Sequence, residues 1–417
     1  MRRQKIITLT ALAVTSALAL GGCGGSNGGG DSPSPAVTAS SSTTASASGN
    51  LTVWVDETRQ AAVTAAALEF ENATGVKVTV VLKNFDDIRP QFVVQVPTGE
   101  GPDIIAGPHD WLGELTTNGV VAPLELGAKA SEFNPVSLQA FTVDGQIYGL
   151  PYAVENIGLI RNTDLVPTAS EATWDATVAA GTAVGTKYPI IIAVGADGDG
   201  YTLYPFQTSF GAPVFAQNAD GSYRPEIAMG GDGGHDYAAW LAAQGKAGLL
   251  SPDVTYDVAV AAFAAAETPY IVGGPWMLDQ FKALNLAIDP LPRAGSKDAQ
   301  PFVGVQGFYL SAQSKNAIVA NDFLVNYLSS ESVQYALYES GGRPPALISA
   351  ADKASADPLI AGFNAAGQNA VPMPSIAEMG SVWAFWGTTE VGIIEGSLDP
   401  TPAWDKMVAD IQAAIKG

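Results

Sequence analysis

The stretch of sequence that decides the fold class is LTVWVDETRQAAVTAAALEFENATGVKVTVVL, residues 51–82. It opens with β-branched and aromatic residues over 51–55, which is typical of a strand. Apolar residues then recur at helical spacing over 59–74, and Gly75 is the expected stop of that helix. Valines alternate with polar residues over 76–82, which indicates a second strand. This order of strand, helix and strand predicts an α/β fold with a largely parallel sheet.

The same alternation continues outward from this unit. A helix is expected over 85–96, a strand over 103–106 and a helix over 110–118. Farther along, the continuous apolar run 189–194 is typical of a buried strand. The later expected elements are helices over 235–246, 256–267, 275–284, 317–329 and 331–340, strands over 269–273 and 307–311, and helical structure from about 352, whose last helix starts with Thr401 as N-cap and Pro402 in its first turn.

Length and charge exclude several classes of protein. The 417 residues are too many for one compact core, and they favour two domains of roughly 150–200 residues each. The chain holds 41 acidic and 20 basic residues, a net charge of −21, which makes nucleic acid and anionic membranes unfavourable partners. With two histidines and one cysteine, an internal disulfide is impossible and a Cys/His zinc site is disfavoured. We therefore expect no metal and no cofactor.

The first 48 residues are expected to serve export and anchoring. Basic residues at positions 2, 3 and 5 precede the apolar run 6–20, which is too short to span a bilayer comfortably. The run ends in Leu20-Gly21-Gly22-Cys23, which resembles the lipobox of bacterial lipoproteins. That resemblance implies a signal peptide over 1–22 and a lipid on Cys23; the alternative is an ordinary signal peptide with an incidental cysteine. Residues 24–48 are almost entirely Gly, Ser, Thr, Ala and Pro, which indicates a flexible tether.

Six blocks of the body identify a family resemblance. In chain order they are LTVWVDETR (51–59), GEGPDIIAGPHDWLGELTTNGVVAPL (99–124), GLPYAVENIGLIRNTDLVP (149–167), GGPWM (273–277), PFVGVQGF (301–308) and MGSVWAFWG (379–387). Their order and their spread over 49–417 are similar to the maltose/maltodextrin-binding proteins, within the extracellular solute-binding class that feeds ABC importers. The resemblance implies a two-lobed, periplasmic-binding-protein-like α/β fold of type II with a sugar cleft between the lobes.

The resemblance also implies lobes that are discontinuous in sequence. We expect an N-lobe from 49–153 plus 308–352 and a C-lobe from 158–302 plus 359–417. The chain would cross the hinge at 154–157, 303–307 and 353–358.

A sugar site needs flat aromatic rings for the C–H faces and carboxylates or amides for the hydroxyl groups. In the N-lobe, the resemblance implies ligand contacts from Asp110 and Trp111, from Arg59, and from Glu155 at the first crossing. It also implies an acidic residue beside Arg59 within Asp56-Glu57-Thr58, for which Glu57 is the choice and a shift of one residue stays open. Two alternatives stay open: Asp110 as a helix N-cap, and Glu57 with Arg59 as a solvated helix start. His109 is expected to be a structural hydrogen-bonding residue.

In the C-lobe, the resemblance implies that Asp199 and Tyr201 contact the ligand and that tryptophans stack on it. The tryptophans are Trp276, Trp383 and, less centrally, Trp386; the alternative for each is a place in the core. Two positions depart from the family pattern. Gly107 stands where well-known members have a tryptophan, and Gly387 stands where the family has an arginine, so Trp111 is a candidate to supply the missing aromatic wall.

The expected function is therefore non-enzymatic. The chain would bind maltose or maltodextrins as a monomeric lipoprotein on the outer face of the cytoplasmic membrane and deliver them to the transmembrane subunits of an ABC permease. A receptor for another oligosaccharide, such as trehalose, is one alternative. An exported glycoside hydrolase is another, because it also needs aromatic subsites and a pair of carboxylates.

Overall fold

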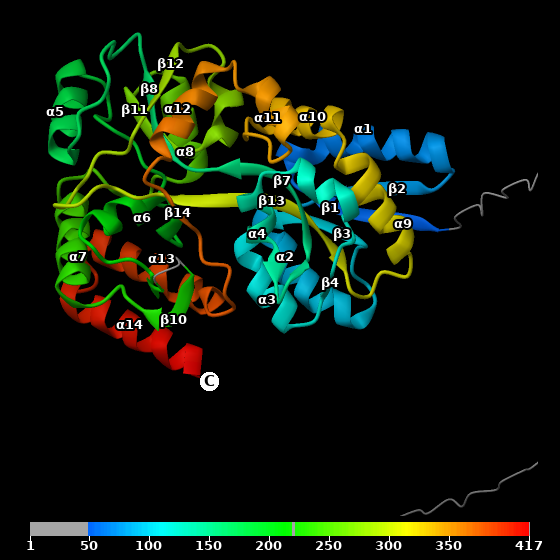
Figure 1. Ribbon diagram of the computed structural model, residues 1–417. Helices are drawn as coiled ribbons and strands as arrows, with labels where there is room; N and C mark the ends of the chain where they lie inside the picture. Colours follow the sequence, from blue (N-terminus) through cyan, green and yellow to red (C-terminus); the bar gives the residue numbers. More distant parts are fainter. Residues whose placement is uncertain (1–48, 219–221, 417) are drawn as a thin grey trace, which may run out of the picture. The chain divides into compact units, whose positions relative to one another are not determined.

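The computed structural model describes residues 49–416 except 219–221 (Figure 1). The predicted signal peptide, Cys23 and the tether lie outside the described residues. Among those described, no helix is both long enough and apolar enough to cross a membrane.

The N-lobe is built on a seven-stranded sheet (Figure 1). Strand β1 pairs in parallel with β2 and β3, as the opening stretch predicts, while β13 runs antiparallel to β3 and β7. The strands of this sheet are β1 (Asn50–Val55), β2 (Lys77–Leu82), β3 (Ile104–Pro108), β4 (Val121–Ala122), β7 (Gly149–Glu155), β13 (Phe302–Ser311) and β14 (Val371–Pro372). The last, β14, pairs only with the first residues of β13 and packs against the C-lobe core. The α-helices of this lobe are α1 (Glu57–Thr74), α2 (Phe85–Gln95), α3 (Leu112–Thr117), α4 (Pro135–Ala140), α9 (Ala317–Asp322), α10 (Glu331–Gly341) and α11 (Ile348–Ala354).

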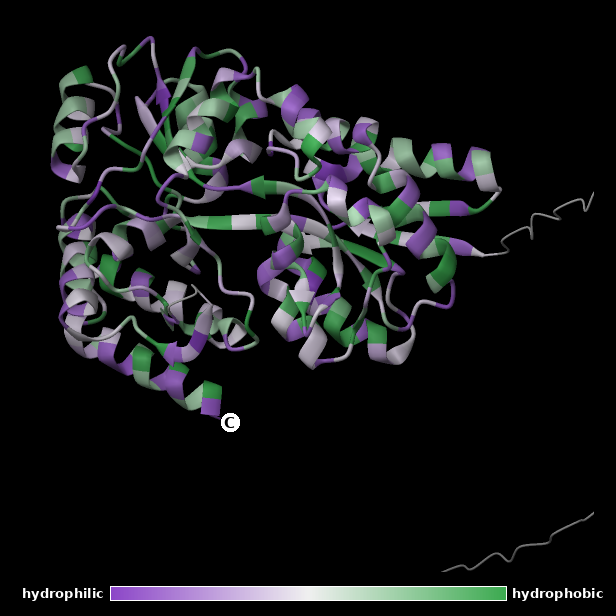
Figure 2. Cartoon of the chain, viewed as in Figure 1, coloured by the Kyte–Doolittle hydropathy of each residue, from purple (hydrophilic) through white to green (hydrophobic). Residues whose placement is uncertain are grey.

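Local sequence explains why α1 begins and ends where it does. Asp56 is its N-cap and accepts a hydrogen bond from the Thr58 amide at 2.9 Å. Gly75 ends the helix with a φ of 77°, a left-handed conformation that glycine adopts without strain. The helix buries Val63, Ala66 and Phe70 with strands of the sheet in one apolar core. Figure 2 shows the hydrophobic colouring that runs along most of β13.

The C-lobe is built on a three-stranded sheet in which β8 lies between β11 and β12 and is antiparallel to both. This arrangement differs from the parallel style of the N-lobe. Its strands are β8 (Gly158–Asn162), β11 (Tyr270–Gly273) and β12 (Leu286–Asp289), and a separate hairpin pairs β9 (Phe215–Gln217) with β10 (Tyr223–Ile227). Its α-helices are α5 (Trp174–Val184), α6 (Gly200–Ser209), α7 (Gly231–Lys246), α8 (Tyr256–Ala264), α12 (Pro358–Ala366), α13 (Met379–Glu395) and α14 (Pro400–Lys416).

Three sequence predictions for this lobe are wrong. The run 189–194 is buried and extended, but it makes only one isolated bridge, between Ile191 and Ile271, so it is not a strand. The helix expected over 275–284 is the shorter 3₁₀ helix η4 (Pro275–Phe281). The last helix starts at Pro400, so Thr401 lies inside it and is not its N-cap.

The chain passes between the two cores three times. Strand β7 pairs with β13 in the N-lobe sheet, whereas β8, only three residues later, belongs to the C-lobe sheet. Strand β13 begins at Phe302 in the C-lobe core and continues to Leu310 in an N-lobe core. The third passage lies between α11, whose Ala350 is in an N-lobe core, and α12, whose Phe363 is in a C-lobe core.

Candidate ligand-binding site

The residues of the candidate site come from both lobes. The N-lobe contributes the start of α1, the end of β3, the end of β7 and the segment after α10. The C-lobe contributes the start of α6, the start of η4 and the first turns of α13. Contacts between these segments join the two lobes directly, as the following pairs show.

Arg59 is buried, with 1% of its surface exposed, so it is not part of a solvated helix start. Its guanidinium donates to the Tyr152 hydroxyl at 2.5 Å and to the Gln306 side-chain oxygen at 2.6 Å. It also forms an ion pair with Asp56. The prediction that Glu57 is the acidic residue beside Arg59 is wrong: Glu57 is exposed, and the N-cap Asp56 lies within the first turn at the (i, i+3) spacing that suits the pair.

Glu155 lies at the end of β7, next to the first passage between the lobes. Its Oε1 accepts from the Gln306 amide at 2.6 Å, and its Oε2 accepts from Arg343 Nε at 2.7 Å. Arg343 also donates to the Thr58 hydroxyl at 3.0 Å. The charges of Glu155 and Arg343 are therefore paired, as are those of Arg59 and Asp56, and this part of the site is close to neutral.

Arg343 also reaches the C-lobe. Its guanidinium carbon lies 5.4 Å from the centroid of the Trp276 ring, in the range of a cation–π contact. Within the C-lobe, the centroid of the Tyr201 ring lies 6.3 Å from that of the Trp276 ring. Both rings are half-buried. Burial raises the pKa of Tyr201 well above its ordinary value, so its hydroxyl stays protonated and can donate a hydrogen bond.

Asp110 lies just after β3 and has 8% of its surface exposed. Its Oδ1 atom is buried and has no hydrogen-bond partner, and its side chain caps no helix. Burial raises the pKa of Asp110 to about 6, while the Arg89 charge and a hydrogen bond from the Trp383 side chain act in the opposite direction. This hydrogen bond joins an N-lobe carboxylate to a C-lobe indole.

His109 behaves as a structural residue. Its Nδ1 accepts from the Val305 amide at 3.0 Å, so its Nε2 carries the proton and donates to the Met373 carbonyl oxygen, also at 3.0 Å. Burial lowers the pKa of His109 to about 4, which keeps the ring neutral at physiological pH.

The two glycines that depart from the family pattern have clear structural reasons. A Cβ atom on Gly107 would lie 2.2 Å from the Trp111 ring, so Trp111 covers the space that a side chain at 107 would occupy. Trp111 itself is buried, between the Phe85 ring and the Arg89 guanidinium. A Cβ atom on Gly387 would lie 2.4 Å from the Asp197 carbonyl oxygen, so no arginine fits there. Arg343, from the other lobe, is the guanidinium that this structure places against a C-lobe aromatic ring, that of Trp276.

Trp383 and Trp386 differ in exposure. Trp383 is half-buried on α13, whereas Trp386 is fully buried one turn later, with the two rings parallel within 22° and 5.4 Å apart. Trp386 therefore lies behind Trp383 and offers no surface to a ligand in this structure. Asp199 is the N-cap of α6, accepting from the Thr202 amide at 3.0 Å, and burial raises its pKa.

Sequence reasoning missed three of the residues in this network, namely Tyr152, Gln306 and Arg343. Tyr152 and Gln306 lie inside motifs that carry the family resemblance, which was the available signal. Arg343 stands in Gly-Gly-Arg-Pro-Pro, far in sequence from every other member, and only the fold brings it to Glu155 and Trp276.

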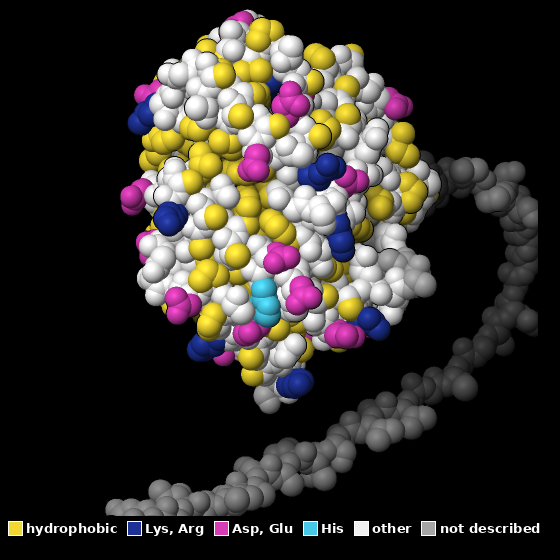
Figure 3. Space-filling model, turned by 90° about the vertical axis from the view of Figure 1, so that its left-hand side faces the viewer, with side chains coloured by type: hydrophobic (Ala, Val, Ile, Leu, Met, Phe, Trp, Pro, Cys, Tyr) yellow, Lys and Arg dark blue, Asp and Glu magenta, His cyan; other side chains and the backbone are white. Residues whose placement is uncertain are grey.

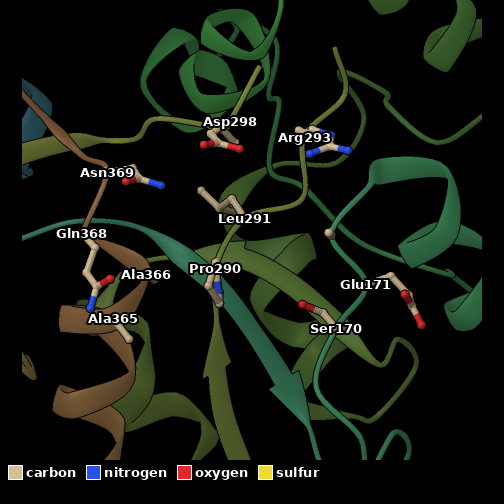
Figure 4. Close-up of a pocket in the computed structure, with 12 residues that line it drawn as sticks. Ser170, Glu171, Pro290, Leu291, Arg293, Asp298, Ala365, Ala366, Gln368 and Asn369 are labelled. Carbon is tan, nitrogen blue, oxygen red and sulfur yellow. The ribbon is translucent and has the colours of Figure 1, made fainter. Parts of the chain in front are cut away.

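Other features of the described residues point to no second chemistry. No cluster of three or more His, Cys, Asp or Glu among them could hold a metal ion. A cavity of about 340 Å³ lies on the C-lobe between the end of α12 and the segments around Ser170 and Arg293, away from the expected ligand residues (Figure 4). On the face that Figure 3 shows, Lys and Arg side chains are scattered among acidic and apolar ones, with no basic patch for nucleic acid.

Two α/β cores joined by three chain passages, with aromatic rings and paired charges where the lobes meet, define a two-lobed binding protein of the periplasmic type. A model of the bacterial extracellular solute-binding protein family matches residues 65–362, and the chain belongs to this family. Members of this family bind solutes and are not catalytic, so this chain is not an enzyme.

Comparison with known proteins agrees with this assignment. The chain is similar to the maltotriose binding protein of Thermus thermophilus, solved with maltotriose bound, with a TM-score of 0.80 and 31% identity over 88% of this chain and 100% of that chain. The galactooligosaccharide-binding protein of Bacillus subtilis is 28% identical over 88% of this chain and 89% of its own length. The maltodextrin-binding protein MdxE of the same organism is 27% identical over 80% and 82%. The predicted two-lobed α/β fold is thereby confirmed.

Proposed function

We propose that this chain is the oligosaccharide receptor of an ABC importer. It would bind a neutral oligosaccharide between its lobes and deliver it to the transmembrane subunits of a permease. Relatives named for malto- and galacto-oligosaccharides support this class of ligand, and one relative is named as the solute-binding lipoprotein of a maltooligosaccharide ABC transporter. The predicted lipid on Cys23 would hold the monomer on the outer face of the cytoplasmic membrane.

The observation that carries the proposal is the composition of the site. Three half-buried rings belong to it: Trp383 lies beside Asp110, whose Oδ1 has no partner, Trp276 lies against the Arg343 guanidinium, and Tyr201 lies beside Trp276. Flat rings suit the C–H faces of sugars, and a shielded carboxylate oxygen suits a hydroxyl group. We propose these five residues as ligand contacts.

The charge pairing argues for a neutral ligand. Arg59 is paired with Asp56, and Arg343 is paired with Glu155. An acidic sugar would need an unpaired cation, and these pairs leave none among the site residues named here. Arg59, Glu155, Trp111 and Trp386 are buried, so we assign them the task of holding the contact residues in place. Exposed Glu57 and the capping Asp199 would lie at the edges of the site.

Maltodextrins are the first candidate ligands, because the solved relative holds maltotriose and has the higher identity. Galacto-oligosaccharides are the second, because the relative named for them aligns over 386 residues. A thermal-shift screen of the mature protein with maltotriose, a galacto-oligosaccharide and trehalose tests both. A ligand present at 100 times its dissociation constant adds about 2.7 kcal/mol of stability, which gives a clear shift of melting temperature. Absence of any shift with all three sugars would contradict the proposal.

A further inference from the structure

The fully buried Trp386 connects two parts of the proposed site. Its ring is stacked on Trp383, with centroids 5.4 Å apart. It also meets the first turn of α6, because a Cβ atom on Gly200 would lie 2.6 Å from the indole. Gly200 stands between Asp199 and Tyr201, so glycine at this position lets the turn that carries them rest on the ring. Any movement of Trp386 would therefore be passed both to Trp383 and to this turn.

One buried polar side chain holds the Trp386 indole, and a second lies one helical turn away. Its Nε1 donates to Gln207 Oε1 at 3.1 Å, and the Gln207 amide is in turn fixed by the Ala212 carbonyl oxygen at 2.6 Å. Glu390 lies one helical turn farther along α13, on the same face of the helix as Trp386. Glu390 is fixed by the Tyr237 hydroxyl of α7, at 2.8 Å. None of Gln207, Glu390 and Tyr237 has any exposed surface.

Glu390 is an unusual side chain for this position. It is a carboxyl group in an apolar core, and its Oε2 atom has no hydrogen-bond partner. The titratable groups that face it are Tyr237 on α7 and Asp199 at the start of α6, and neither supplies a positive charge. Burial, followed by the charge of Asp199, raises the pKa of Glu390 to about 8. The group is thus neutral at pH 7, and its ionisation would put an uncompensated charge under the Trp386 ring.

We propose that Gln207 and Glu390 are positioning residues of the ligand site, which act through Trp386 on the Trp383 ring and on the turn with Asp199 and Tyr201. Neither touches the ligand. The effect on ligand binding rests on the function proposed above. The effect on ring geometry does not, because the stacked pair of indoles can be observed without any ligand.

The experiment follows the exciton signal of the stacked indoles in the circular dichroism spectrum, with W386F used to identify it. In the wild-type protein we expect this signal to fall at least twofold between pH 7 and about pH 9, with a midpoint near the pKa of Glu390. The variant E390Q cannot ionise, so the alkaline change should disappear. Q207L removes an acceptor of the indole N–H and should weaken the signal at every pH.

The affinity for maltotriose should change with pH as the ring signal does. In the wild-type protein it should fall about tenfold between pH 7 and about pH 9, and in E390Q it should not change over this range. The control is W54F, in an N-lobe core, where the ring lies against Lys83 and makes no recorded contact with Trp383, Trp386 or Tyr237. W54F should lose stability while the ring signal and the affinity stay unchanged.

Identical pH courses of the ring signal in wild type and E390Q, or an unchanged signal in Q207L, would overturn the proposal. If no sugar binds to the wild-type protein while the ring signal behaves as expected, the proposed function fails and the positioning role of Gln207 and Glu390 stands.

Discussion

Replacement of Asp110 by asparagine should make the protein more stable and its ligand binding weaker. Asp110 is a carboxylate with 8% of its surface exposed, one oxygen without a partner and no ion pair. Folding therefore removes this charge from water without forming an ion pair that would compensate for the lost hydration. A residue whose main task was structural would not carry such a cost, whereas a residue that waits for a ligand hydroxyl group would.

The size of the cost follows from the pKa of Asp110. Burial raises this pKa from 3.8 to about 6, and one pKa unit corresponds to 1.36 kcal/mol, so the cost is about 3 kcal/mol. Above pH 6 the carboxylate is charged in both the folded and the unfolded state, and the folded protein bears the whole cost. As pH falls from 6 to 3.8, the folded state takes up its proton first and the cost disappears.

Urea unfolding of wild type and D110N at several pH values tests this reasoning. At pH 7, D110N should be more stable by up to about 3 kcal/mol, and the difference should vanish below pH 4. Calorimetric titration with maltotriose should show a loss of affinity of about 10-fold to 100-fold, because a hydrogen bond to a charged acceptor contributes about 1.5–3 kcal/mol. The matched control is Asp289→Asn, which removes a buried carboxylate that is paired with Arg161 and should therefore lower stability. A D110N variant that is less stable than wild type at pH 7, or that binds with unchanged affinity, would refute the reasoning.

Three further predictions concern other parts of the chain. Trp383→Ala should lower sugar affinity at least tenfold in calorimetric titration. In denaturant unfolding it should cost less stability than Trp404→Ala, for which about 3–5 kcal/mol is expected because Trp404 is fully buried. A large loss of stability with unchanged affinity would show that Trp383 is a core residue. Gly387→Ala should cost about 1–3 kcal/mol of stability in the same unfolding assay, because the new Cβ would lie 2.4 Å from a carbonyl oxygen. Gly380→Ala on the same helix should be tolerated, because the nearest atom to its Cβ would be 3.7 Å away. Equal effects of the two variants would contradict the packing argument. Cys23→Ser should release the protein from membranes, and unchanged membrane fractionation would disprove the lipid anchor.

The sequence predicted the N-lobe better than the C-lobe for a physical reason. Over 51–118, each strand and helix has its own periodicity, cap or stop, and the structure has them within a few residues of the expected bounds. The run 189–194 has the apolar composition of a buried strand, but a strand also needs partners. Only Ile191 finds one, and composition alone cannot reveal that.

The candidate site shows the same limit. The family pattern led to Asp110, Tyr201, Trp276 and Trp383, of which Asp110 lies beside Trp383 and Tyr201 beside Trp276. It ranked Trp386 below Trp383 but still counted it as a ligand contact, because residues one helical turn apart share a face and these two differ in depth. It did not lead to Arg343, since its role depends on long-range contacts with Glu155 and Trp276 that no local pattern encodes.

The hydrogen bonds decide which of the four predicted carboxylates is available to a ligand. Glu57 is in water, where it gains little from one more hydrogen bond. The Oδ1 atom of Asp199 already accepts a hydrogen bond as the N-cap of α6. Each carboxylate oxygen of Glu155 also accepts a hydrogen bond, and the one from Arg343 is charge-assisted. Asp110 alone of the four keeps a buried oxygen without a partner, beside the half-buried Trp383. A buried acceptor without a hydrogen-bond donor lowers the stability of the folded protein by about 1–3 kcal/mol. A sugar hydroxyl group that donates to this oxygen would remove that cost on binding.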